Sequence, residues 1–415
     1  MLAEVASRSQ QGVAASPTTG SAAYASSIST SGGDEGPAAA APPVQGRGRR
    51  QAGGGKQSSI SVLCRTPEQV EACLSLPWLQ EVVLDFLEVQ GLWEAVAAVK
   101  GASKRVIVAT PRVLKPNEEP LIAFYLRLRA DALLLRSAGL LYTLSSLGGP
   151  GTLVPGLLDP KGNPVHVPEL HGDFSLNVAN TLSADLLLRG SSLSRIAPTH
   201  DLSAPQICGL ATSLGPLRAA TSLEVILHQH LPIFHTEHCV FCRFLSSGNS
   251  YKDCGHPCEQ HKVHLRDEKG ADHLVLADMG CRNTIFNAQA QSGAFYVQDL
   301  VRAGVRKFRI ELVDEQRELV VPLVQGYRDL LDGSRSSGDL WTWMGSLSRA
   351  GVGAGSLEGA RARDRGASTL RSTAAAQKEE ARHKLPAGRD ANKAGAGCAV
   401  NARTTAVLNK EVRCK

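Results

Sequence analysis

The sequence of 415 residues has no run of eighteen or more uninterrupted apolar residues, so it offers no transmembrane helix. It is also poor in cysteine for its length. Ten cysteines in such a chain are too dilute for a disulfide scaffold, in which cysteines are concentrated in a short secreted domain. What the sequence does have is 43% hydrophobic residues, enough to bury the core of one large barrel or of two average domains.

The chain lacks an even distribution of charge. Its net charge is +6, but Lys and Arg outnumber Asp and Glu by 14 to 6 over residues 349–415 and by 5 to 3 over residues 1–57. The remaining residues, 58–348, therefore carry a net charge of −4. The basic character belongs to the terminal segments, so it says nothing about what the central part binds.

The two terminal segments lack the composition of a folded domain. Residues 1–57 are rich in Ala, Gly and Ser, show no apolar periodicity and end in an arginine-rich stretch. This composition predicts either a low-complexity tail or an organellar transit peptide. A transit peptide would direct the protein to a chloroplast or a mitochondrion, and without one we expect a cytoplasmic protein. Residues 349–415 predict a second, basic, disordered tail.

Between the tails, short apolar runs alternate with helical patterns. We expect strands in eight runs: 59–63, 81–87, 105–110, 131–136, 172–178, 193–199, 222–230 and 307–313. Most of the early runs start 22 to 26 residues apart, which is typical of repeated βα units. The sequence therefore predicts an α/β fold over 58–348, a (βα)8 TIM-barrel-like parallel barrel, with an open doubly wound sheet as the alternative.

In a parallel barrel the functional side chains lie at the carboxyl ends of the strands. The side chains at or after the predicted strand ends are Asp85, Arg112, Arg136, Asn177, Asn180, His228, His230, Glu237, Arg309 and Glu311. From these we take as candidate catalytic residues Arg112, Arg136, Asn177, His228, Glu237, Arg309 and Glu311. Such a mixture of arginines, acids, amides and histidines suits a small polar or anionic substrate. Each also has a structural explanation, such as a helix cap for Asp85 or an ion pair between Arg136 and Glu311.

Five of the ten cysteines fall in one segment, in an insert at 237–281 between the seventh and eighth predicted strands. They are Cys239, Cys242, Cys254, Cys258 and Cys281. Paired cysteines at short spacing are typical of four-cysteine zinc sites, which would leave one cysteine over. Iron-sulfur clusters also take four thiolates. The spacing leaves zinc and iron-sulfur equally open.

Several stretches resemble the collagenase-like peptidase family, peptidase class U, family 32. The strongest are "EHCVFCRFLS", "CGHPCEQHKVHLRD", "GCRN" and "AGVRKFRIE", and upstream "VIVATPRVLKPNEE" and "HGDFSLNVANTLSA" occur in the same order as in that family. The resemblance covers roughly residues 58–332. It implies the barrel fold and, for several members, a 4Fe-4S cluster that supports hydroxylation of RNA bases or of a quinone precursor.

Carried over by position, the resemblance implies Cys239, Cys242, Cys254 and Cys281 as cluster ligands and Cys258 as a spare. The family spaces its first cysteine pair six residues apart, whereas here two residues intervene, so the choice between Cys254 and Cys258 stays open. The expected partners are RNA or a small anionic substrate.

Two alternatives remain beside the cluster interpretation. The family name implies a metal-dependent protease acting on peptides, with a metal on His228, His230, His235 and Glu237. However, HExxH, GxSxG and catalytic-cysteine signatures are missing from the sequence. The second alternative is a non-catalytic module with a structural metal site.

Overall fold

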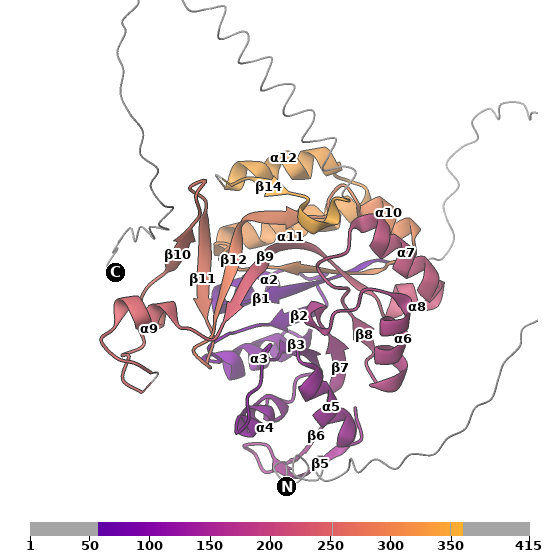
Figure 1. The fold of residues 1–415 in the computed structure, drawn as a ribbon. Coiled ribbons are helices and arrows are strands. Elements are labelled where there is room, and N and C mark those ends of the chain that lie inside the picture. Colours follow the sequence, from indigo (N-terminus) through magenta and orange to yellow (C-terminus); the bar gives the residue numbers. More distant parts are fainter. Residues whose placement is uncertain (1–56, 251, 349, 360–415) are drawn as a thin grey trace, which may run out of the picture. The chain divides into compact units, whose positions relative to one another are not determined.

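The structure, a computed structural model, describes residues 57–250, 252–348 and 350–359 (Figure 1). The predicted transit peptide and most of the predicted C-terminal tail lie outside these residues. Within the described part, the ordered structure continues past the predicted boundary at residue 348, through a short strand and a 3-10 helix. None of the described helices is long and apolar enough to cross a membrane.

Twelve strands of the described residues form one sheet (Figure 1). In spatial order eleven of them are β10 (Val263–Arg266), β11 (Asp272–Ala277), β12 (Asn283–Ser292), β9 (Glu224–Thr236), β13 (Lys307–Glu311), β1 (Ser59–Cys64), β2 (Glu81–Leu84), β3 (Arg105–Ala109), β4 (Ala132–Leu135), β7 (Glu169–Gly172) and β8 (Arg195–Ile196). The twelfth, β14 (Val352–Gly353), pairs with β12. In this spatial order, every neighbouring pair from β9 through β13 and β1 to β8 is parallel. The pairs β9–β12, β12–β11 and β11–β10 are antiparallel. A separate hairpin joins β5 (Leu153–Leu158) to β6 (Pro164–His166).

Helices alternate with the parallel strands, as expected of βα units. They are α2 (Pro67–Leu74), α3 (Leu92–Gly101), α4 (Glu119–Arg127), α5 (Ala138–Ser146), α6 (Thr181–Gly190), α7 (Ala204–Leu214), α8 (Pro216–Thr221), α9 (Val240–Leu245), α10 (Val297–Arg302), α11 (Arg317–Asp332) and α12 (Ser337–Leu347), with 3-10 helices η1 (Phe174–Leu176), η2 (Pro257–Glu259) and η3 (Gly355–Leu357). The local sequence explains where several of these helices begin. Thr66 caps α2 ahead of Pro67, and Asn180 and Ser183 cap α6 reciprocally.

The sheet is a curled, parallel-rich half barrel, and the prediction of a closed barrel is wrong on this point. Seven of the eight predicted strand regions contain a strand, in the predicted order, whereas the region 172–178 meets β7 only at Gly172 and includes the 3-10 helix η1. The sheet does not close at β8, which has only two residues and is followed closely by Pro198. Proline has no backbone N–H to donate to a ladder. Between β8 and the start of β9 the described residues contain a single isolated bridge, from Ile196 to Leu223, and no ladder.

Two apolar layers flank the parallel strands. The large one lies between the outer face of the sheet and the helices, and includes Val62, Leu84, Val108 and Phe308. The small one lies on the inner face, where Leu63, Val83, Ile107, Ala109, Ala132 and Leu134 form a separate cluster. Because the parallel strands are buried on both faces, their sequences are nearly continuous runs of Val, Ile and Leu.

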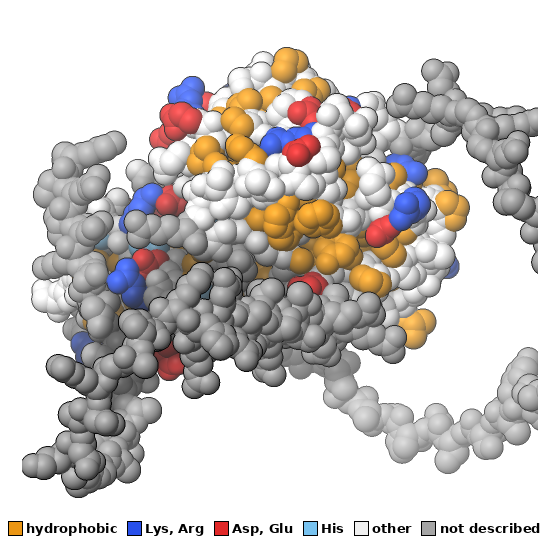
Figure 2. Space-filling view, turned by 90° about the horizontal axis from the view of Figure 1, so that it is seen from above, with side chains coloured by type: hydrophobic (Ala, Val, Ile, Leu, Met, Phe, Trp, Pro, Cys, Tyr) orange, Lys and Arg blue, Asp and Glu red, His pale blue; other side chains and the backbone are white. Residues whose placement is uncertain are grey.

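The segment between β9 and β13 carries the five clustered cysteines. β9 is 13 residues long and continues as an antiparallel partner of β12 beyond the parallel strands (Figure 1). A small apolar cluster of its own, including Phe241, Val275 and Ile285, holds α9 against β11 and β12. Apolar side chains also reach the surface in patches bordered by polar atoms on the face seen in Figure 2. Scattered exposure of this kind is ordinary for folded domains.

Candidate functional site

A cavity of about 60 Å³ lies at the carboxyl ends of the parallel strands. Its lining includes Arg65, Asp85, Thr110, Arg112, Tyr125, Arg136, Phe174, His235, Asp278, Met279, Phe286 and Glu311. Two of its buried nitrogen atoms, Nε of Arg65 and Nε2 of His235, have no hydrogen-bond partner among the described residues. This cavity, called here the sheet-end cavity, occupies the place where ligands bind in parallel α/β proteins.

Beneath the sheet-end cavity lies a buried network of charges. The Arg136 guanidinium donates to both carboxylate oxygens of Asp85, at 2.7 and 3.0 Å, and to Asp173 at 2.8 Å. Arg309, which is fully buried, pairs with Glu224 at 2.8 Å, with Glu311 at 2.9 Å and with Asp173. Burial alone would raise the pKa of Asp173, but Arg309 and Arg136 hold it well below its ordinary value.

Three candidate residues from the sequence, Arg136, Arg309 and Glu311, therefore belong to one network. The expected pairing of Arg136 with Glu311 is replaced by pairs with Asp85 and Asp173. Because each arginine already has two or more carboxylates, neither presents a free positive charge, and the network fixes the strand ends. Asp85, which we considered as a helix cap, is one of its members.

Arg112 differs from these arginines because it forms no ion pair with any described residue. Its guanidinium lies over the Phe174 ring, 5.6 Å from the centroid, and lines the sheet-end cavity. Burial and the nearby Arg136 lower the pKa of Arg112. Of the two candidate amides, Asn177 is exposed and ends η1 in a left-handed conformation, with φ of 57°, and Asn180 caps α6. Arg112 is thus the cationic candidate that is available to a ligand.

Cys242 and Cys281 lie near each other, and each lies near Cys239 and Cys254. Burial raises the pKa of Cys281, and the thiols of Cys239, Cys254 and Cys242 raise it further. Burial and the thiols of Cys254 and Cys239 likewise raise the pKa of Cys242. The backbone N–H of Cys242 donates to Sγ of Cys239 at 3.5 Å, and Nδ2 of Asn283 donates to the same sulfur at 3.9 Å.

Cys258 has a different environment. Burial and then the Glu88 carboxylate raise the pKa of Cys258 to about 12, and its thiol hydrogen-bonds that carboxylate. Cys239 is the one clustered thiol among the main influences on it. A protonated thiol bound to a carboxylate is a poor metal ligand, because the ligand form is the thiolate.

Two residues that the sequence did not single out shape the cysteine segment. A Cβ atom at Gly248 would lie 2.4 Å from the backbone oxygen of Asp253, so only glycine lets the chain approach itself just before Cys254. Arg282, fully buried, bonds both oxygens of Glu118 at 2.8 Å and Glu237 at 3.2 Å. Its position directly after Cys281 is a signal that sequence reasoning could have used.

The cysteine segment adjoins the sheet-end cavity. Asp278 and Met279 line that cavity, and Cys281 follows two residues later in the same turn. The N–H of Met279 donates to the carbonyl of Leu87, which also lines the cavity and precedes Glu88. Within the described residues no group of three or more His, Cys, Asp or Glu side chains has an arrangement that could hold a metal ion as it stands. The donor set of four neighbouring thiols is nonetheless chemically suited to a cluster or to zinc.

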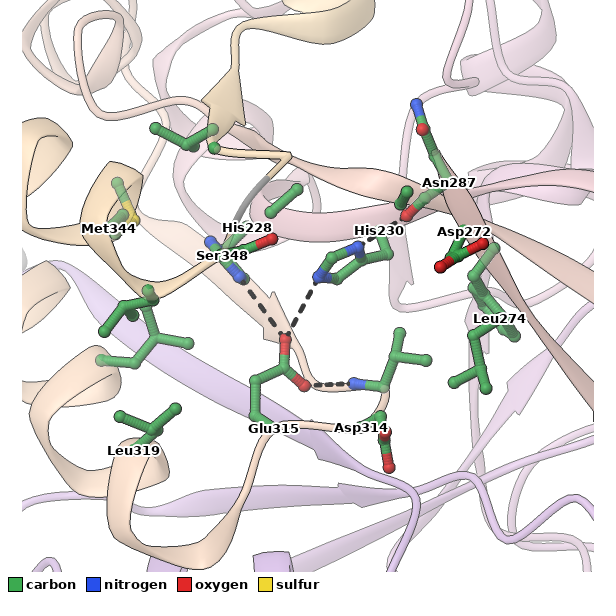
Figure 3. Close-up of a pocket in the computed structure, with 18 of the residues that line it drawn as sticks. His228, His230, Asp272, Leu274, Asn287, Asp314, Glu315, Leu319, Met344 and Ser348 are labelled. Carbon is green, nitrogen blue, oxygen red and sulfur yellow. Dashed lines mark hydrogen bonds and ion pairs between the residues drawn. The ribbon is translucent and has the colours of Figure 1, made fainter. Parts of the chain in front are cut away.

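The histidines of β9 serve two different cavities. His228 and His230 line a second cavity of about 330 Å³, together with Glu315 (Figure 3). His235 lines the sheet-end cavity, and Glu237 is paired with Lys115 and Arg282. The four side chains considered for a protease metal therefore do not meet at one point.

The middle of the chain matches a known family model. Residues 163–349 match the model described as Peptidase family U32. Residues 163–349 therefore form a region of the U32 family. All five clustered cysteines and the histidines His228, His230 and His235 lie inside the matched U32 region, whereas Arg112 and Arg136 precede it. No curated protein matches the chain.

Solved structures resemble this chain weakly. The U32 peptidase Mk0906 is 9% identical with a TM-score of 0.34, over 64% of this chain and 97% of that one. The spore cortex-lytic enzyme SleL of Bacillus cereus is 10% identical with a TM-score of 0.32, over 65% and 75%. SleL of Bacillus megaterium QM B1551 is 8% identical with a TM-score of 0.29, over 62% and 71%.

Proposed function

We propose that this U32 protein is an iron-sulfur protein that supports hydroxylation of RNA bases or of a quinone precursor. The observation that carries the proposal is the neighbourhood of four thiols, Cys239, Cys242, Cys254 and Cys281, beside the sheet-end cavity. On this proposal they hold a 4Fe-4S cluster, which when bound supplies one-electron transfer. Cys258, bonded to Glu88, is not a ligand.

The chemistry of the sheet-end cavity supports a small anionic substrate group. Arg112 has no acidic partner among the described residues, and the Nε–H of Arg65 is buried without an acceptor. A carboxylate or phosphate would accept from both and would satisfy a donor that is otherwise costly to bury. The role of Asp85, Arg136 and Arg309 would then be to hold the cavity wall in place. A volume of about 60 Å³ admits a group of that size and excludes a folded chain.

The proposal is tested first by the metal. Protein purified without oxygen should be brown and contain about four irons and four sulfides per chain. Cys242→Ala and Cys281→Ala should each lose the iron, because a methyl group cannot replace a thiolate. Cys64→Ala is the matched control, since Cys64 is buried against Cys73, with the two sulfur atoms 3.6 Å apart. Colourless protein with one zinc per chain would contradict the cluster.

The substrate is tested in cells. Nucleosides and quinone precursors should be compared by mass spectrometry between wild-type cells and cells with Cys242→Ala, and one hydroxylated product should disappear. Arg112→Gln should lower the same product while retaining the iron. If the wild-type protein contains iron but no hydroxylated product differs between the two kinds of cell, the cluster has a structural role. Hydrolysis of collagen peptides that persists without iron would favour the protease instead.

A further inference from the structure

The larger cavity, which Figure 3 shows, is not used by the proposed function. Strands β11 and β12 contribute Leu274 and Phe286 to its lining. Helices α11 and α12 contribute Leu319, Leu323 and Met344. Leu319 and Leu323 are four residues apart, so they lie on the same face of α11. The cavity therefore has apolar walls that are built from both strands and helices.

The polar end of the cavity is an ion-paired group. Oε1 of Glu315 faces Nε2 of His230 at 3.6 Å and Nε2 of His228 at 3.8 Å (Figure 3). Oε2 of the same carboxylate accepts from the N–H of Val313 at 2.6 Å. The other ring nitrogen of His230, Nδ1, lies 2.7 Å from the backbone oxygen of Asn287. These side chains already serve one another, so a ligand of the cavity does not have to supply a charge.

The other two acids of the lining are also paired, with cations that lie outside it. Asp314 pairs with Lys262 and Asp272 pairs with Arg266, each at 2.6 Å. No Lys or Arg is among the described residues that line the cavity. An anionic ligand would therefore meet carboxylates without a lysine or arginine to pair with, and a cationic ligand would compete for carboxylates that already have partners. The charges favour a neutral ligand.

The volume of the cavity, about 330 Å³, indicates the size of the ligand. An apolar cavity of about 150 Å³ is enough to bind benzene, and sites for small molecules typically start at about 300 Å³. Leu347, at the end of α12, belongs to the lining and is 40% exposed, so the cavity is open to solvent beside this residue. The cavity therefore admits a compound of two or three rings, or an aliphatic chain of similar volume.

We propose that the larger cavity binds a neutral, mainly apolar small molecule. The affinity comes from burial of the apolar surface of this molecule against the leucines, Phe286 and Met344. The site is separate from the cysteine centre, because none of the five clustered cysteines is among the described residues that line it. It is also separate from the sheet-end cavity, with which it shares Phe286 alone among the described lining residues.

Fluorescence titration of the full-length protein with phenylnaphthylamine tests the proposal. This three-ring amine is uncharged at neutral pH, and its fluorescence increases in apolar surroundings. We expect saturable binding of one molecule per chain. Anilinonaphthalene sulfonate has the same rings and one negative charge. It should bind about tenfold more weakly, because the cavity offers no lysine or arginine to the sulfonate.

Two substitutions in the lining should each weaken the binding of phenylnaphthylamine about tenfold. Ala288→Phe replaces a small lining residue of β12 by a ring and leaves less room for the probe. Leu319→Glu places a charge in the apolar wall. Because Leu319 is in the first turn of α11, where the helix dipole favours an acid, the helix should still form.

Leu217→Glu is the matched control, because it makes the same change in the first turn of α8, at an exposed residue outside the lining. It should bind phenylnaphthylamine like the wild type. Circular dichroism checks folding, and if one of the two cavity variants unfolds, the other decides. Absence of saturable binding, unchanged binding in the folded cavity variants, loss of binding in Leu217→Glu, or equal affinity for the sulfonate would each overturn the proposal.

Discussion

Arg282 donates to both carboxylate oxygens of Glu118, at 2.8 Å each, across 164 residues of sequence. This bond ties the turn that carries Cys281 to the loop that leads into α4. The guanidinium is fully buried, so its charge depends on such partners.

We expect Glu118→Gln to loosen the turn at Cys281. Hydrogen exchange followed by mass spectrometry should show faster exchange in the peptide around residues 278–283, because a neutral amide pairs weakly with a buried guanidinium. Glu119→Gln is the control, since Glu119 is the next acid in the chain and forms no ion pair with a described residue. Equal exchange in the two variants would contradict the anchoring role of Glu118.

The fourth ligand of the cysteine centre should be Cys254. Cys254→Ser should lower the iron content to that of Cys242→Ala, because its thiol neighbours Cys242 and Cys281. Cys258→Ser should keep the iron, since the thiol of Cys258 hydrogen-bonds Glu88. Iron and sulfide analysis of the two serine variants, prepared side by side without oxygen, decides between them, and the opposite result would make Cys258 the ligand.

Gly248→Ala should damage the metal centre without unfolding the domain. Its new methyl group would meet the backbone of Asp253 at 2.4 Å and the amide nitrogen of Cys254 at 2.7 Å, so this loop has to open. We expect reduced iron content with an unchanged far-ultraviolet spectrum. Gly209→Ala is the matched control, because a methyl group there has no atom within 4 Å. Full iron content in Gly248→Ala would show that the loop tolerates the change.

Glu81 should make the protein sensitive to acid. Burial opposes its charge, but Arg195 and other neighbouring cations lower its pKa to about 2, against 4.5 for a free glutamate. A lowered folded-state pKa stabilises the fold above the unfolded-state value, and this stabilisation is lost as the pH falls from about 4.5 towards 2. Between pH 6 and pH 3 the contribution should fall by about 2 kcal/mol.

Urea unfolding of wild type and Glu81→Gln at the two pH values measures this contribution. The difference in free energy of unfolding between the two proteins should be larger at pH 6 than at pH 3. A difference that does not change with pH would mean that the ion pair with Arg195, at 2.7 Å in the structure, does not persist in solution.

The strands could be predicted from the sequence because each is a short buried apolar run between helical patterns. The first expected strand, 59–63, is observed as Ser59–Cys64, and the last, 307–313, as Lys307–Glu311. Closure of the sheet could not be predicted, because it depends on the pairing of β8, which has too few residues to form a ladder.

The candidate site was predictable where its residues are close in sequence. The cysteines were identified by spacing, although spacing could not separate Cys254 from Cys258, whose difference comes from Glu88 on a distant loop. Glu315 was missed because it is 85 residues beyond His230 and meets it only through the neighbouring strands β9 and β13. Its position just after a predicted strand end was the one available signal.

The irregularity in β9 determines which side chains of this strand face the helices. Arg309 and Ile310 of β13 are neighbours but pair with Ile226 and His228, so Leu227 is an extra residue in β9. Before it, Glu224 faces the buried charges, and after it, His228 faces Tyr327 on α11. If the same residues formed a regular strand, Leu227 would lie opposite Ile310, and His228 and His230 would turn to the opposite face of the sheet. The bulge therefore decides which face of the sheet receives the two imidazoles.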